Sequence, residues 1–127
     1  MNARNGVTIS ALCSSIVGAI LLFAPDEASR VLMLVSGDPI LAQLLGAALL
    51  GFGAANWTAR GALLGGIYGR AVVAGNQMHL MVGAFVLVTH GVNVSAPHPA
   101  YWVLTLLYVL GAAFFSYLMF FSSGLRR

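Results

Sequence analysis

The chain has 127 residues, of which 60% are hydrophobic and 7% are charged, and its formal net charge is +3 at pH 7. A soluble domain of this size could not bury so much apolar surface, so the composition indicates a single membrane domain. The basic residues are arginines spread along the chain rather than gathered in one patch, which argues against a nucleic-acid partner. The single Cys13 excludes an internal disulfide and a thiolate metal cluster, and we expect no metal site.

Four apolar stretches take up most of the chain, and each is long enough to cross a bilayer. They cover residues 7–24, 39–57, 71–94 and 101–122. At 1.5 Å of rise per residue such helices span about 27–36 Å, close to the hydrocarbon thickness of about 30 Å. We therefore predict an all-α membrane protein in which residues 1–127 form one domain of four antiparallel transmembrane helices.

The positions of the arginines predict the orientation of these helices. Arg4 precedes the first stretch, Arg60 and Arg70 flank the second connection, and Arg126 and Arg127 close the chain. Because basic residues favour the cytoplasmic side of a membrane, we expect both termini and the second connection to be cytoplasmic. The expected location is the inner (plasma) membrane of the cell.

The first connection, residues 25–38, is long enough to contain a short helix. Pro25, Asp26 and Glu27 provide a helix start. Residues 28–35, which follow, carry four apolar residues on an otherwise polar stretch: Val31, Leu32, Leu34 and Val35. We predict a short amphipathic helix that lies in the outer membrane interface.

Small residues predict how the helices pack, because close backbone approach drives helix association in lipid. Such residues recur every four positions on the first stretch and on the second, where Gly46 and Gly53 also lie nearby: Ser10, Ser14 and Gly18, then Ala47, Gly51 and Ala55. We expect these two faces to meet. The fourth stretch carries bulky rings that we expect to face lipid or a partner: Phe114, Phe115, Phe120 and Phe121.

Polar groups at membrane depth are the main candidates for a functional site, because they are costly in hydrocarbon. His79 lies nine residues after Arg70, about 13 Å along a helix, and therefore near the midplane. Tyr108 lies at a similar depth. The candidate set is Asn56, Asn76, His79, His90 and Tyr108. It is interpreted either as an interhelical hydrogen-bond network or as a ligand-binding or proton-linked site. We expect Asn56, Asn76 and His79 to face the bundle interior, with Arg60 and Arg70 at its cytoplasmic mouth.

Two further ligand hypotheses follow from local patterns. Gly75 and Gly83 lie one turn on either side of His79, which would let a flat haem or chlorin approach. However, all the membrane histidines lie on one stretch, so two facing axial ligands are not available, and we expect no cofactor. Arg60 and Arg70 could bind an anionic lipid phosphate, or they could only anchor helix ends.

One segment resembles a known group of proteins. It reads Asn56-Trp57-x-x-Arg60, then Gly65-Gly66-Ile67-Tyr68-Gly69-Arg70, then Asn76 and His79. This pattern resembles small, uncharacterised four-helix integral membrane proteins of bacteria. The resemblance implies the four-helix architecture and a coherent unit of residues, and it implies no activity.

The apolar stretches contain no carboxylate and no nucleophile with a visible base, so we predict a protein that is not an enzyme. The favoured hypothesis is an accessory or structural subunit of a membrane complex, or a protein that self-associates, with the lipid bilayer as its surroundings. Two alternatives stay open. The first is a small transporter or channel, and the second is a subunit that binds haem, chlorin or quinone.

Overall fold

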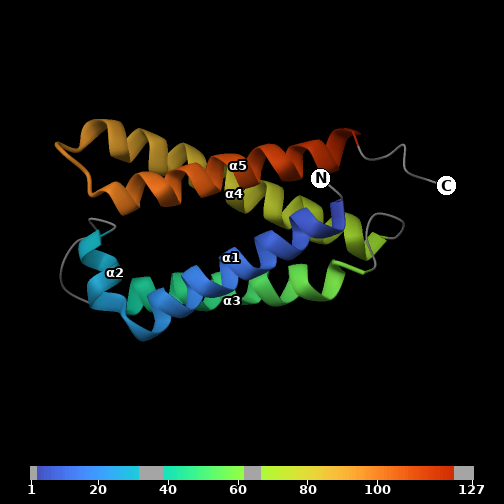
Figure 1. Cartoon of the computed structure of the whole chain (residues 1–127), viewed down its shortest axis with the longest axis horizontal. Coiled ribbons are helices and arrows are strands. Elements are labelled where there is room, and N and C mark those ends of the chain that lie inside the picture. Colours follow the sequence, from blue (N-terminus) through green and yellow to red (C-terminus); the bar gives the residue numbers. More distant parts are fainter. Residues whose placement is uncertain (1–2, 32–38, 62–66, 122–127) are drawn as a thin grey trace.

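The computed structural model describes residues 3–31, 39–61 and 67–121. These residues form helices joined by turns, with no strand among them (Figure 1). The helices are α1 (Ala3–Phe23), α2 (Pro25–Val31), α3 (Ile40–Ala59), α4 (Ile67–Asn93) and α5 (Pro99–Phe121). α1, α3, α4 and α5 are long and apolar enough to span a membrane. The prediction of four such helices is confirmed.

The helix bounds differ from the predicted apolar stretches mainly at the starts of α1 and α4. α1 begins at Ala3, ahead of residue 7, and α4 begins at Ile67, ahead of residue 71. Hydropathy marks only the part of a helix that matches hydrocarbon, whereas hydrogen bonding continues through polar turns at its ends. The polar first turns of α1 and α4 were therefore outside the prediction.

α2 corresponds to the predicted short helix but begins three residues earlier, at Pro25. Proline suits a first helical position, and the carboxylates of Asp26 and Glu27 interact favourably with the positive end of the helix dipole. Glu27 also forms an ion pair with Arg30. Ala28 packs α2 against the neighbouring helices. Residues 32–35 of the predicted helix lie outside the described residues.

α1 and α3 pack through opposed glycines. A Cβ atom on Gly18 would lie 2.8 Å from the carbonyl oxygen of Gly46, and a Cβ atom on Gly46 would lie 2.7 Å from that of Gly18. Gly53 lies against Ser15 and Ala11 in the same way. Contacts that lie later along α1 lie earlier along α3: Gly18 meets Gly46, whereas Ala11 and Ser15 meet Gly53.

The predicted small face of α3 needs a correction. Gly51 has nothing within 4 Å of where a Cβ atom would lie, and Ala47 is exposed. The buried positions of α3 are instead Ala42, Gly46, Leu49, Gly53 and Asn56. These steps alternate between four and three residues, as a helix with 3.6 residues per turn requires. The strict four-residue series chosen from the sequence starts one position away and drifts off the interface.

α5 also differs from the expectation that its phenylalanines face outward. Phe115 is fully buried in a cluster with Val7, Val73 and Leu118, and the ring of Phe114 covers Gly6. Phe120 and Phe121 are exposed, as expected. Adjacent phenylalanines on a helix point about 100° apart, so all of them could not share one environment.

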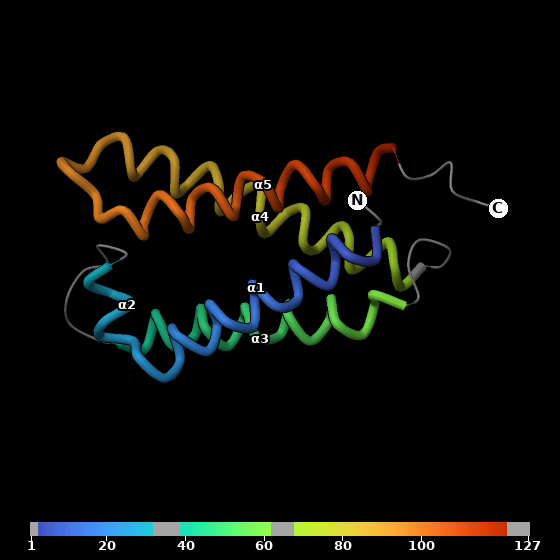
Figure 2. Tube along the Cα trace, in the orientation of Figure 1, coloured from blue at the N-terminus to red at the C-terminus, as the bar shows by residue number. Residues whose placement is uncertain are grey.

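The long helices form two packed pairs, α1 with α3 and α4 with α5. Figure 1 shows the first pair in the lower half of the view and the second in the upper half. The start of α1 and the end of α5 lie at one end, and α2 lies at the other. In the trace of Figure 2, α4 descends toward α3 at the end where α1 starts. The polar contacts between the two pairs lie on this part of α4.

Candidate functional site

Asn56 and Asn76 form a reciprocal amide pair between α3 and α4. The Nδ2 atom of Asn56 donates to Oδ1 of Asn76 at 2.9 Å, and Nδ2 of Asn76 donates back to Oδ1 of Asn56 at 2.7 Å. The two residues are 0% and 2% exposed. The sequence predicts both residues in the bundle interior, and both are buried there.

The remaining amide hydrogens of this pair also have acceptors. Asn56 donates to the Ser10 hydroxyl oxygen at 3.3 Å, and Asn76 donates to the Val72 carbonyl at 2.8 Å. The pair therefore ties α1, α3 and α4 together. Because hydrocarbon offers no alternative partner, an internally satisfied amide pair is far less costly there than a single amide.

His79 lies three residues after Asn76, between two aromatic rings. The Phe52 ring of α3 stacks on the imidazole with centroids 4.6 Å apart and an interplanar angle of 22°. On the side of α5, Nε2 of His79 lies 3.1 Å from the Tyr108 hydroxyl. The sequence predicts a similar depth for His79 and Tyr108, and in the structure the two side chains are also in contact.

The two glycines that flank His79 accommodate these rings. Gly83 lies against the Tyr108 ring, and a Cβ atom on Gly75 would be 3.7 Å from Phe52. The space that could have admitted a flat macrocycle is therefore filled by protein side chains. A haem or chlorin could stack beside His79 only if Phe52 and Tyr108 moved away.

Two further polar contacts lie between α4 and α5. Gln77 donates to the Ser116 hydroxyl at 2.8 Å, while its own Oε1 is buried without a partner among the described residues. The Tyr101 hydroxyl donates to the Leu87 carbonyl at 2.7 Å. These contacts join the two helices of one pair.

Three partners of the polar residues were not predicted from the sequence: Phe52, Ser10 and Ser116. The position of Phe52 beside His79 could have been predicted from the register of α3 against α4. In two helices that run in opposite directions, pairing Asn56 with Asn76 brings the residue one turn before Asn56 close to His79. Ser10 was assigned only a packing role, because the depth at which α1 crosses α3 is not visible in the sequence.

His90 does not join this network. Its side chain is exposed, and its ring centroid lies 6.1 Å from that of Tyr101 near the turn between α4 and α5. His90 is thus separated from His79 by three turns of α4. No group of three or more potential metal ligands occurs among the described residues.

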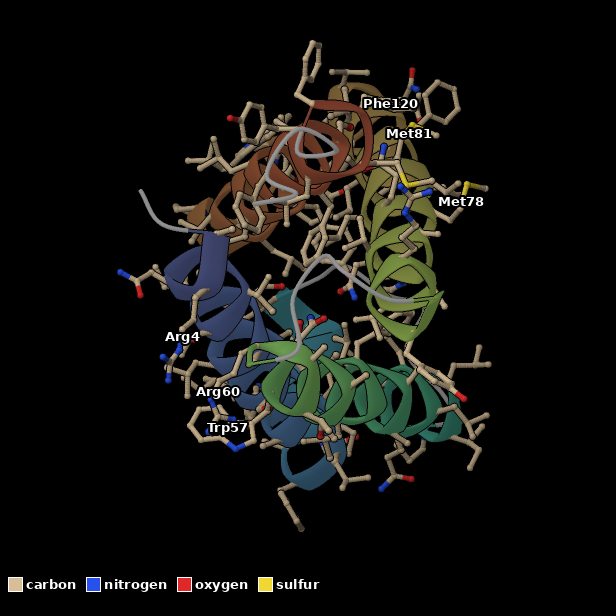
Figure 3. All side chains as sticks on the ribbon, turned by 90° about the vertical axis from the view of Figure 1, so that its right-hand side faces the viewer. Arg4, Trp57, Arg60, Met78, Met81 and Phe120 are labelled. Atoms are coloured by element: carbon tan, nitrogen blue, oxygen red, sulfur yellow. The ribbon has the colours of Figure 1, made fainter. Side chains whose placement is uncertain are left out.

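The two arginine candidates lie apart from the amide pair. Arg60 places its guanidinium 3.5 Å from the centroid of the Trp57 ring and donates to the Trp57 carbonyl at 2.5 Å. In Figure 3 both side chains lie at an outer corner of the bundle, so Arg60 does not line an inner mouth. Arg70 is exposed on α4. Residues 62–66, which include the diglycine Gly65-Gly66, lie outside the described residues.

An apolar cleft of about 280 Å³ separates α1 from α5. Leu49 of α3 and Leu80 of α4 also line it. Polar lining residues are few, and they include Ser10 and Ser14 of α1 and Tyr108 of α5. The cleft therefore reaches the side chain of Tyr108, the residue whose hydroxyl contacts His79.

Comparison with known proteins gives no match to a protein family, a curated protein or a solved structure.

Proposed function

We propose that the chain is a multi-pass integral membrane protein whose four long helices cross the bilayer as an antiparallel bundle. The proposal is supported by helices long and apolar enough to span a membrane and by the many apolar side chains that they expose. The arginines favour cytoplasmic termini in an inner (plasma) membrane. α2 would then lie in the outer interface.

Within the membrane, we propose a role without catalysis, as an accessory or structural subunit of a complex or as a homo-oligomer. The observation that carries this proposal is the mutual bonding of Asn56 and Asn76, whose remaining amide hydrogens also have acceptors. Conduction and ion coupling usually use ionisable groups or a polar path that stays open to water or substrate. Polar groups that satisfy one another favour a packing role.

Purification of the full chain in a mild detergent tests this proposal. We expect a colourless preparation in which the chain forms either a stoichiometric complex with another membrane protein or a homo-oligomer. Size-exclusion chromatography with light scattering, mass spectrometry and a visible spectrum provide the readouts. A lone monomer that moves ions or solutes in proteoliposomes would favour a transporter instead, and a Soret or chlorin band would favour pigment binding.

The cleft between α1 and α5 supports a second candidate function, the binding of a lipid-soluble quinone. An apolar cavity of about 150 Å³ already holds benzene, so 280 Å³ has room for a substituted six-membered ring. With its proton on Nε2, His79 donates to the Tyr108 oxygen and leaves the hydroxyl hydrogen free. That hydrogen can then be donated to a quinone carbonyl.

Titration of the detergent-solubilised chain with a short-chain quinone tests this second candidate. We expect saturable binding, and Tyr108→Phe should weaken it about tenfold, the loss of about one hydrogen bond. Tyr117→Phe is the matched control, because Tyr117 is an exposed tyrosine of the same helix. Absence of saturable binding, or equal affinities for the two variants, would remove the quinone hypothesis.

A further inference from the structure

Two arginines lie at the same end of the α1–α3 pair. The hydrogen bond between Asn56 and Ser10 places these residues at one level. Arg4 lies six residues before Ser10, and Arg60 lies four residues after Asn56, so both arginines are about 6–9 Å beyond that level in one direction. Figure 3 shows Arg4 and Arg60 gathered with Trp57 at one corner of this end.

The charges of this corner are not neutralised within the described part of the chain. There, the one ion pair is between Arg30 and Glu27, on α2. Arg4 is exposed, and Arg60 uses Nη1 for the Trp57 carbonyl, which leaves its other guanidinium hydrogens available. Two guanidinium groups with free donors are suited to the oxygens of a phosphate.

An apolar groove leads away from this corner along the crossing of α1 and α3. It is lined by Ala11, Leu12 and Ser15 of α1 and by Leu50, Gly53, Ala54 and Trp57 of α3. Along α3 the lining extends from Trp57 to Leu50, about 10 Å. The groove therefore has the length and character needed for part of an acyl chain.

The basic corner and the groove belong to one continuous surface. Trp57 lines the groove, and the Arg60 guanidinium lies over its ring. On α1, Arg4, Ala11 and Ser15 are separated by steps of seven and four residues, which keep them on one face. Tryptophan is also enriched, like tyrosine, at the level of lipid head groups.

We propose that Arg4, Arg60 and Trp57 bind the head group of an anionic phospholipid, one acyl chain of which lies in the α1–α3 groove. This inference rests on the membrane location proposed above. The proposed site joins Arg60 with Arg4 instead of with Arg70, the partner suggested by the sequence, because α4 contributes no residue to the groove. Both the positive charge and the adjoining apolar groove match an anionic lipid rather than a soluble anion.

Fluorescence quenching by brominated phospholipids tests the site in the full chain. Trp102→Phe leaves Trp57 as the single tryptophan, and the protein is reconstituted in phosphatidylcholine vesicles. Equal fractions of brominated phosphatidylglycerol or brominated phosphatidylcholine are then added as quenchers. We expect phosphatidylglycerol to quench Trp57 preferentially, with the preference falling up to about fivefold for each of Arg4→Gln and Arg60→Gln.

Two further variants separate the site from general surface charge. Arg70 is an exposed arginine near the same end, and Arg70→Gln should keep the preferential quenching by phosphatidylglycerol. Ala54→Phe should fill the groove and reduce quenching by brominated phosphatidylglycerol while every arginine is retained. An unchanged preference in the Arg4→Gln and Arg60→Gln double variant would overturn the proposal, and so would an equal loss in Arg70→Gln.

The experiment also distinguishes this inference from the membrane location on which it rests. If Trp57 is quenched equally by both lipids, the chain is in the bilayer but has no anionic-lipid site. If neither lipid quenches it, the membrane location itself is wrong.

Discussion

Gly46→Ala is expected to lower the stability of the bundle, whereas Gly51→Ala, only five residues further along α3, is expected to preserve or raise it. A Cβ atom at position 46 would lie 2.7 Å from the Gly18 carbonyl oxygen and 2.9 Å from the Leu22 nitrogen. Both neighbours are backbone atoms, so α1 and α3 must move apart. Overpacking of this kind costs about 1–3 kcal/mol.

Gly51 provides the matched control for this prediction. A Cβ atom there meets nothing within 4 Å, and alanine is the better helix former by roughly 0.5–1 kcal/mol. Thermal unfolding of the two variants in one detergent, followed by circular dichroism, should show shifts of opposite sign or a shift for Gly46→Ala alone. Equal losses of stability would mean that α1 and α3 do not meet at Gly18 and Gly46.

The contrast between Gly46 and Gly51 also illustrates how far the sequence could predict the fold. Hydropathy was sufficient for the number of long helices, because the length and apolar character that a bilayer requires of a span can be read from the sequence. It placed the starts of α1 and α4 four residues too late. Hydropathy could not show which face of α3 packs on α1, because α3 carries several stripes of small residues. Which stripe packs depends on the backbone of α1 that lies opposite. The sequence pattern of α3 alone carries no information about that backbone.

For the candidate site, depth along a helix was predictable but partners were only partly so. Asn76, His79 and Tyr108 were recognised because polar groups in apolar stretches are rare and their depths follow from residue counting. Phe52 and Ser116 were not, because an aromatic ring or a serine in an apolar stretch has many possible roles. Arg60 was matched with Arg70 through their nearness in sequence, whereas the crossing of α1 and α3 places it with Arg4.

Removing one amide of the Asn56–Asn76 pair is expected to destabilise the chain more than removing both. Asn76→Leu leaves the Oδ1 atom of Asn56 and one of its amide hydrogens without a partner, although Asn56 is fully buried. An unsatisfied buried group costs about 1–3 kcal/mol in soluble proteins, and bonds between membrane helices average about 0.6 kcal/mol. Replacement of both residues by leucine removes the orphaned groups and leaves an apolar contact of similar volume.

A double-mutant cycle measures this coupling. The stabilities of Asn56→Leu, Asn76→Leu and the double variant are compared with that of the unmodified chain by thermal or denaturant unfolding in detergent. We expect the double variant to lose less stability than either single variant, because residues in direct contact are not additive. Asn93→Leu is the control, since Asn93 is exposed and bonds only to the Thr89 carbonyl of its own helix, so its loss should be small. Additive losses at positions 56 and 76 would show that the two amides act independently, which would remove the observation on which the packing role depends.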